Sequence, residues 1–319
     1  MDDPSGPNQR GTPGLTGVAG LVKALRNLGL IGRGRAGARS QQSFAVGDGQ
    51  SIPVHITGSG PPVVLVHGLG CSHRSWNGVV RSLARRHRVI TWDARGHGQC
   101  VPLPGRAITL QRLARDVHEL LDTLALERVA LVGHSMGALT VMQYLLDHGS
   151  ARLAAVGLVD QSPRIVTDDD WRLGLFGGCP RSLLGGVLAG AREDLAATVL
   201  HEIEAAAGGW LRPLIAPGAP IGGLLRRWLV GIDASFLLDL SESLLAADFR
   251  PVLPRLDVPL WVVLGAKSAH YAGVPLDDYY RRTVPHAQVT TYARSGHSPH
   301  VAEPQRFARD LQSFLADHA

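Results

Sequence analysis

The stretch Val129-Ala130-Leu131-Val132-Gly133-His134-Ser135-Met136-Gly137 decides the fold of this chain. Its first four residues are apolar and predict a short buried strand, and the residues that follow the stretch, 138–146, predict a helix. Ser135 lies where the strand turns into the helix, and the glycine on each side lets the two backbones pass closely. A serine in this strand–turn–helix context is predicted to be a nucleophile rather than an ordinary turn residue.

A nucleophilic serine needs a base that removes its proton, an acid that holds the base, and amide donors for the oxyanion. His297 is the candidate base, because Ser295-Gly296-His297 follows the strand-like segment Gln288–Tyr292. Ligands bind at the carboxyl edge of open parallel sheets, so a histidine on a loop at that edge can reach the serine.

Two backbone N–H groups are the candidate oxyanion donors. His67-Gly68-Leu69-Gly70 ends an apolar strand, and Met136 directly follows the serine. We therefore predict that the amides of Leu69 and Met136 form the oxyanion hole, with little dependence on their side chains.

Strands and helices alternate through most of the chain, which predicts an α/β fold with a mostly parallel central sheet covered by helices on both faces. The strands are expected at 63–66, 89–92, 129–132, 156–159 and 260–264, and the helices at 76–85, 110–124, 138–146 and 304–316. Strand patterning stops between the fourth and fifth of these strands. We therefore expect a core at 43–161 and 253–319, a helical cap at 162–252, and an N-terminal extension at 1–42.

Composition and charge narrow the classes of partner. The chain has 319 residues and a formal charge of +5, but its arginines are dispersed, so no nucleic-acid partner is expected. No apolar run is long enough to cross a bilayer. Residues 15–30 are amphipathic and compatible with peripheral membrane contact, although a partly ordered leader or a helix docked on its own domain is favoured. Three cysteines without a CxxC motif fit a cytoplasmic protein.

No cofactor and no metal are expected, because phosphate loops, dinucleotide fingerprints and metal-ligand spacings are all missing from the sequence. The oligomeric state stays open.

Residues 43–319 resemble the α/β-hydrolase superfamily, in the branch of cofactor-free serine esterases and non-haem haloperoxidase-like perhydrolases. The resemblance is carried by Val64-Leu65-Val66-His67-Gly68, Asp93-Ala94-Arg95-Gly96-His97-Gly98, the Ser135 pentapeptide and Gly296-His297-Ser298-Pro299. It implies the α/β-hydrolase fold and a Ser–His–acid triad on Ser135 and His297.

The sequence departs from the family pattern at the acid. The family places Gly-x-x-Asp after the penultimate strand, whereas this chain has Gly265-Ala266-Lys267-Ser268 there. A hydroxyl cannot balance the charge of a protonated imidazole. Asp160, at the end of the strand that follows the serine's helix, is the predicted replacement, and Asp277 is the next candidate.

These residues predict a serine hydrolase that cleaves an ester, thioester or lactone of a hydrophobic small molecule. Trp171 and Tyr271 are expected to line its pocket, because the cap is apolar. An acyltransferase or C–C bond hydrolase could use the same triad, and the pentapeptide also resembles type II thioesterases. A non-catalytic binding protein is the alternative from another class.

Overall fold

The computed structural model describes residues 40–194, 197, 219, 223 and 234–318. Nearly all of the predicted extension, including the amphipathic stretch at 15–30, lies outside these residues. The first strand begins at Ser40, inside the last part of that range. None of the helices within the described ranges is long and apolar enough to span a membrane.

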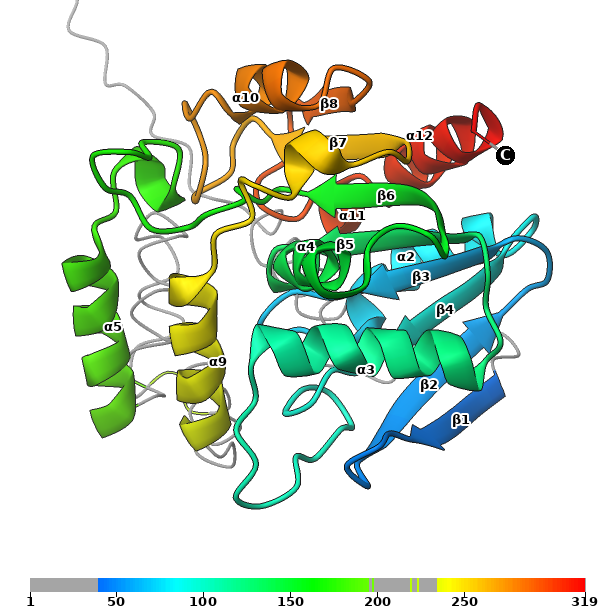
Figure 1. Ribbon diagram of the computed structural model, residues 1–319, viewed down its shortest axis with the longest axis horizontal. Helices are drawn as coiled ribbons and strands as arrows, with labels where there is room; N and C mark the ends of the chain where they lie inside the picture. The colour runs from blue at the N-terminus through cyan, green and yellow to red at the C-terminus, as the bar shows by residue number, and fades with distance from the viewer. Residues whose placement is uncertain (1–39, 195–196, 198–218, 220–222, 224–233, 319) are drawn as a thin grey trace, which may run out of the picture.

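An eight-stranded sheet runs through the centre of the molecule, in the order β1-β2-β4-β3-β5-β6-β7-β8 (Figure 1). β1 and β2 form an antiparallel hairpin, β2 pairs antiparallel with β4, and all later pairs are parallel. The mostly parallel sheet predicted from the sequence is therefore confirmed. The strands are β1 Ser40–Ala45, β2 Ser51–Thr57, β3 Pro62–Val66, β4 Arg88–Trp92, β5 Val129–His134, β6 Leu153–Val159, β7 Leu260–Gly265 and β8 Gln288–Tyr292.

Helices cover both faces of the sheet because successive strand residues point to opposite sides. In β3, Val63 and Leu65 join one core and Val64 and Val66 join the other. One core packs against α2 (Asn77–Leu83) and α12 (Pro304–Ala316). The other packs against α3 (Leu110–Thr123), α4 (Met136–His148) and α10 (Leu276–Thr283).

The α3 helix shows how the sequence sets these boundaries. Thr109 caps its first turn, since the hydroxyl accepts a hydrogen bond from the N–H of Arg112 at 3.2 Å. Apolar residues at helical spacing then form the buried face, namely Leu110, Leu113, Ala114, Val117, Leu120 and Leu121.

The turn at residues 93–98 is a structural feature of the sheet edge. Arg95 is buried and forms ion pairs with Asp116 at 2.6 Å and with Asp48 at 2.7 Å, which ties the turn to α3 and to the first hairpin. Gly98 has φ +56, and a Cβ there would lie 2.3 Å from the Cγ of Asp93. The turn therefore requires glycine at this position.

The segment between β6 and β7, where the sequence predicts a cap, contains helical elements among its described residues. Its described elements are the 3₁₀ turn η2 (Leu175–Gly177), α5 (Arg181–Glu193) and α9 (Ala234–Ala246), and a further 3₁₀ turn, η3 (Leu253–Arg255), precedes β7. In Figure 1, α5 and α9 stand side by side at the edge toward which the parallel strands point. Two tryptophans of the predicted cap, Trp210 and Trp228, lie outside the described residues.

Candidate active site

Ser135 occupies a strained turn between β5 and α4. Its backbone has φ 54° and ψ −122°, a conformation that non-glycine residues rarely adopt. A Cβ at Gly133 would lie 2.2 Å from the carbonyl oxygen of Gly137, and one at Gly137 would lie 2.3 Å from that of Val66. The two glycines allow the close packing that holds the serine in this conformation. Such strain is typical of functional residues.

His297 and Asp160 lie together although 137 residues separate them. Nδ1 of His297 donates a hydrogen bond to Oδ2 of Asp160 at 2.7 Å. The carboxylate is fully buried, whereas the His297 side chain is 22% exposed. With Nδ1 engaged by the carboxylate, Nε2 is the ring nitrogen that remains for proton transfer.

Two further groups hold the Asp160 carboxylate. The N–H of Gly265 donates to Oδ1 at 2.7 Å, and the hydroxyl of Ser268 donates to Oδ2 at 2.6 Å. Asp160 itself has φ 50°, and its own N–H donates to the carbonyl of Val263. Asp160 therefore lies where β6 and β7 end side by side, and Ser268 occupies the loop in which the family pattern has an aspartate.

The segment after β3 packs directly against the serine turn. A Cβ at Gly68 would lie 3.2 Å from the Cβ of Ser135. Among the described residues, neither the N–H of Leu69 nor that of Met136 donates a hydrogen bond to another protein group. Met136 is the first residue of α4, where backbone N–H groups lack partners within the helix. Both predicted oxyanion donors are thus free to bind a ligand.

Uncharged imidazoles surround His297. Nε2 of His134 donates to the carbonyl oxygen of His297 at 2.8 Å, and the ring of His270 lies 4.1 Å from that of His297. Burial, reinforced by the neighbouring histidines, holds the pKa of His134 well below 6.5 and lowers that of His270 to about 4. These two rings stay neutral near pH 7. No sequence pattern indicated that His270 or His134 would contact His297.

The predicted pocket residues lie in different surroundings. The Trp171 ring is buried, with its N–H donating to the carbonyl of Arg164, and it packs edge-on against Tyr279. Tyr271 is buried and accepts a hydrogen bond from the side chain of Gln161. A small cavity of about 200 Å³ is lined by Asp160, Tyr271 and Asp277, among others. Asp277 lies in the first turn of α10.

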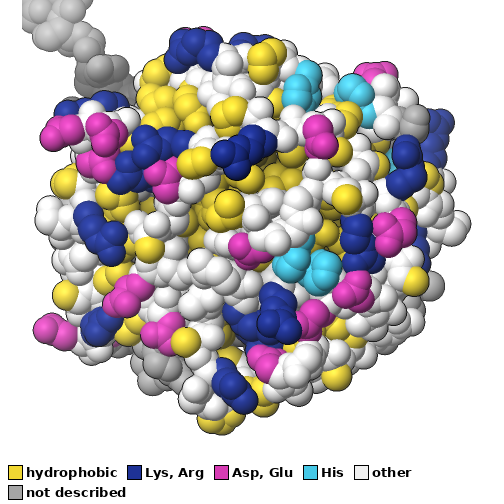
Figure 2. Space-filling view, in the orientation of Figure 1, with side chains coloured by type: hydrophobic (Ala, Val, Ile, Leu, Met, Phe, Trp, Pro, Cys, Tyr) yellow, Lys and Arg dark blue, Asp and Glu magenta, His cyan; other side chains and the backbone are white. Residues whose placement is uncertain are grey.

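Larger cavities open beside α5 and α9. One of about 690 Å³ is lined by residues after β6 together with the ends of α5 and α9, and one of about 800 Å³ lies between α5 and α9. Figure 2 shows hydrophobic side chains gathered on this face between charged groups of both signs. Ser135 and His297 line neither cavity. Contact of Trp171 and Tyr271 with substrate stays a prediction.

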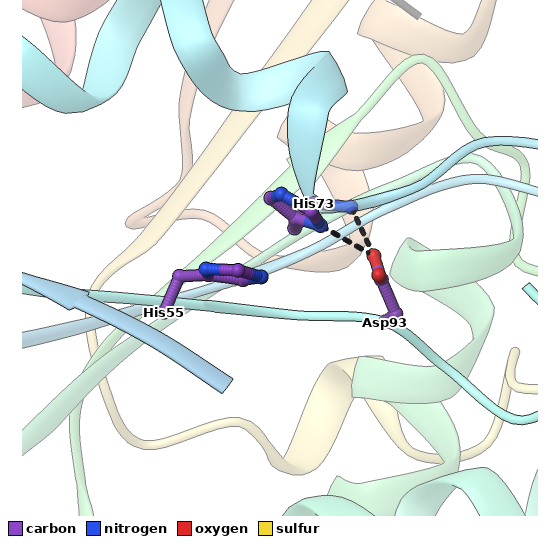
Figure 3. Close-up of side chains that lie close together, drawn as sticks. All are labelled: His55, His73 and Asp93. Atoms are coloured by element: carbon purple, nitrogen blue, oxygen red, sulfur yellow. Dashed lines mark hydrogen bonds and ion pairs between the residues drawn. The ribbon is translucent and has the colours of Figure 1, made fainter. Parts of the chain in front are cut away.

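A second cluster of titratable groups lies outside this site and is drawn in Figure 3. The possible metal-binding atoms of His55, His73 and Asp93 all lie within 4.8 Å of one another. However, both the ring Nδ1 and the backbone N–H of His73 donate to Oδ1 of Asp93, at 2.8 and 2.6 Å. The two imidazole rings stack with centroids 3.8 Å apart, whereas ligands of a tetrahedral ion spread around it. This arrangement fits a buried histidine–aspartate pair that holds the turn before α2.

The sheet order, the inserted helical segment and the strained serine after β5 define the α/β-hydrolase class. Residues 63–310 match the model of the alpha/beta hydrolase family, and the chain belongs to this family.

Individual relatives extend over most of the chain. A pimeloyl-[acyl-carrier protein] methyl ester esterase of Aeromonas hydrophila is 31% identical over 276 residues, covering 83% of this chain and 99% of the esterase. An esterase structure from Exiguobacterium antarcticum has a TM-score of 0.73 and 21% identity, covering 87% of this chain and 100% of that one. A bromoperoxidase structure from Bacillus anthracis has a TM-score of 0.71 and 25% identity, covering 88% and 100%.

Proposed function

We propose that this protein is a serine hydrolase that cleaves an ester, thioester or lactone of a hydrophobic small molecule through an acyl-enzyme. The observation that carries the proposal is the Asp160–His297 hydrogen bond, in a structure that also holds Ser135 in a strained strand–helix turn. The similarity to a pimeloyl-[acyl-carrier protein] methyl ester esterase supports the same reaction class. The exposed side chains of Leu69 and Phe176 support a hydrophobic substrate.

Each group has one task in the proposed reaction. Ser135 Oγ attacks the acyl carbon while Nε2 of His297 takes its proton, and the Leu69 and Met136 amides receive the negative oxygen. The proton passes from His297 to the leaving alcohol, thiol or alkoxide as the bond to the acyl carbon breaks. Water then repeats the attack with His297 as base, which releases the acid and restores Ser135. Asp160 orients His297 and stabilises its protonated form throughout.

Two other reactions use the same groups. Acyl transfer replaces the water with another nucleophile, and C–C hydrolysis replaces the leaving alcohol with a carbanion. In both, the groups beside the acyl carbon decide the outcome rather than the triad. Three free cysteines fit a reducing compartment such as the cytoplasm.

A fluorophosphonate probe and a panel of activated esters with short, long and bulky acyl groups test the proposal together. The wild-type protein should become labelled and hydrolyse one or more of the esters. Ser135→Ala should lose labelling and roughly 10⁶-fold in kcat. Heat-denatured wild-type protein is the control for non-specific labelling. Absence of both labelling and turnover in the folded wild-type protein would support the binding-protein alternative instead.

A further inference from the structure

Ser268 stands at the position where the family pattern has an aspartate, and it contacts Asp160, the proposed acid. It occupies the loop after β7, its side chain is completely buried, and its hydroxyl lies 2.6 Å from Oδ2 of Asp160. The same oxygen accepts the hydrogen bond from Nδ1 of His297. Positions 160 and 268 therefore face a single imidazole from the ends of two neighbouring strands.

The direction of the Ser268 hydrogen bond is set by its surroundings. The backbone N–H of His270 lies 3.3 Å from the Ser268 oxygen and donates to it, so that the hydroxyl proton is directed to the carboxylate. A charged acceptor strengthens such a bond, and donors to a buried carboxylate favour its ionised form. The Ser268 hydroxyl and the N–H of Gly265 together hold both oxygens of Asp160, one of which accepts the hydrogen bond from His297.

We propose that residues 160 and 268 form a two-residue acid site in which Asp160 carries the charge, Ser268 positions it, and the two roles can be exchanged. This inference rests on the proposed function, because it assigns the acid of the same triad. Ser268 touches no reacting atom and is a positioning residue.

Exchange of the two side chains tests the shared site. Asp160→Ser should lose roughly 10⁴-fold in kcat/KM, as expected for a triad without its carboxylate. Adding Ser268→Asp to that variant should recover about a hundredfold or more of this roughly 10⁴-fold loss. Ser268→Asp alone should be impaired, because two adjacent buried carboxylates cannot both ionise. A folded double variant that is no more active than Asp160→Ser would overturn the exchange.

The pH profile of Ser268→Ala tests the positioning role without relying on the double variant. Removal of the donor leaves more negative charge on Asp160 to stabilise protonated His297, so the acid limb of kcat/KM should move to higher pH. Ser162→Ala is the matched control, since Ser162 is equally buried and its hydroxyl donates to a backbone carbonyl at 2.7 Å. An acid limb of Ser268→Ala that coincides with that of wild type and Ser162→Ala would overturn the positioning role.

The two proposals fail in different ways. If Ser135→Ala keeps full activity, the proposed function is wrong. If Ser135→Ala is inactive but the Ser268 variants behave like their controls, only the acid-site inference is wrong.

Discussion

The turn at Ser135 is built from consecutive residues, whereas the carboxylate site joins Asp160 at the end of β6 to Gly265 and Ser268 at the end of β7. At the serine turn, each close contact involves a glycine whose absent side chain makes room for another backbone. At Asp160, the close contacts are hydrogen bonds from two other segments of the chain, one that contains Gly265 and Ser268 and one that contains His297. The first arrangement constrains the backbone, and the second constrains a charge.

This difference predicts different consequences of mutation. A change in the serine turn displaces backbone atoms, so it should reduce stability and activity together. A change in the acid site removes charge or a hydrogen bond while the backbone stays in place. It should reduce activity far more than stability.

Asp160→Asn should produce the largest effect within this comparison, a loss of roughly 10⁴-fold in kcat/KM. The amide is close in size to the carboxylate but cannot balance the protonated imidazole. Steady-state hydrolysis of an activated ester measures the effect, and thermal melting checks that the fold persists. Asp277→Asn is the control, because Asp277 is the alternative acid. If Asp277→Asn rather than Asp160→Asn is inactive, the acid assignment is wrong.

Gly133→Ala should lower the free energy of unfolding by about 3 kcal/mol, since its Cβ would overlap the Gly137 carbonyl oxygen. Urea denaturation measures this loss, and fluorophosphonate labelling of Ser135 should slow in the same variant. Gly185→Ala in α5 is the control, because a Cβ there meets no atom of the described residues within 4 Å. Equal stability of the two variants would contradict the packing argument.

Acid should destabilise the protein through His300, which packs at 4.5 Å from the ring of His134 and is 1% exposed. Burial lowers the pKa of His300 to about 3, so below pH 6.5 the unfolded chain binds a proton that the folded chain does not. The free energy of unfolding that depends on neutral His300 is therefore fully present above pH 6.5, and it falls as the pH drops toward 3.

His300→Phe should remove about 2 kcal/mol of the stability difference between pH 7.5 and pH 5, as expected for one histidine kept neutral by folding. Urea denaturation at the two pH values measures this difference for the variant and the wild type. An unchanged difference would show that His300 takes up its proton in the folded protein.

His134→Phe should have the smallest effect, a loss of about tenfold in kcat/KM, which corresponds to one hydrogen bond. The variant keeps a ring but loses the donor that holds the His297 carbonyl. Gln at position 134 offers a side-chain N–H at similar reach and should restore part of the activity. Labelling of Ser135 should persist in both variants. Equal activity of His134→Phe and His134→Gln would show that the hydrogen bond from residue 134 to the His297 carbonyl does not support activity.

Much of the fold followed from local patterns. The apolar runs at 63–66, 89–92 and 260–264 form β3, β4 and β7 to within one residue at each end, and 304–316 forms α12. Boundaries shifted where weakly apolar residues continue an element. β6 begins at Leu153, three residues before its predicted start, because pairing with β5 extends it through Ala154 and Ala155.

The site divides in the same way. Gly133, Ser135 and Gly137 belong to one pentapeptide. Gly133 is required because its neighbour is the Gly137 carbonyl, and Gly137 is required because its neighbour is the Val66 carbonyl at the end of β3. A short motif in the sequence therefore predicts the serine turn. The carboxylate that meets His297 was predicted only from its place at the end of a strand, with Asp277 left as an alternative. The structure places Asp160 at 2.7 Å from Nδ1 of His297. The contact of His270 with His297 had no counterpart in the sequence pattern.

The sequence by itself determined the sheet, the position of Ser135 and the loop that carries His297, because periodic burial and glycine turns are local properties of a chain. Only the tertiary structure decided which carboxylate faces His297 and gave Ser268 a role beside it. The physical reason is that β6 and β7 are hydrogen-bonded neighbours whose ends meet, although more than a hundred residues separate Asp160 from Ser268. The charge that Asp160 carries at the end of β6 depends on donors from the end of β7 and the loop that follows it, and no local pattern records that pairing.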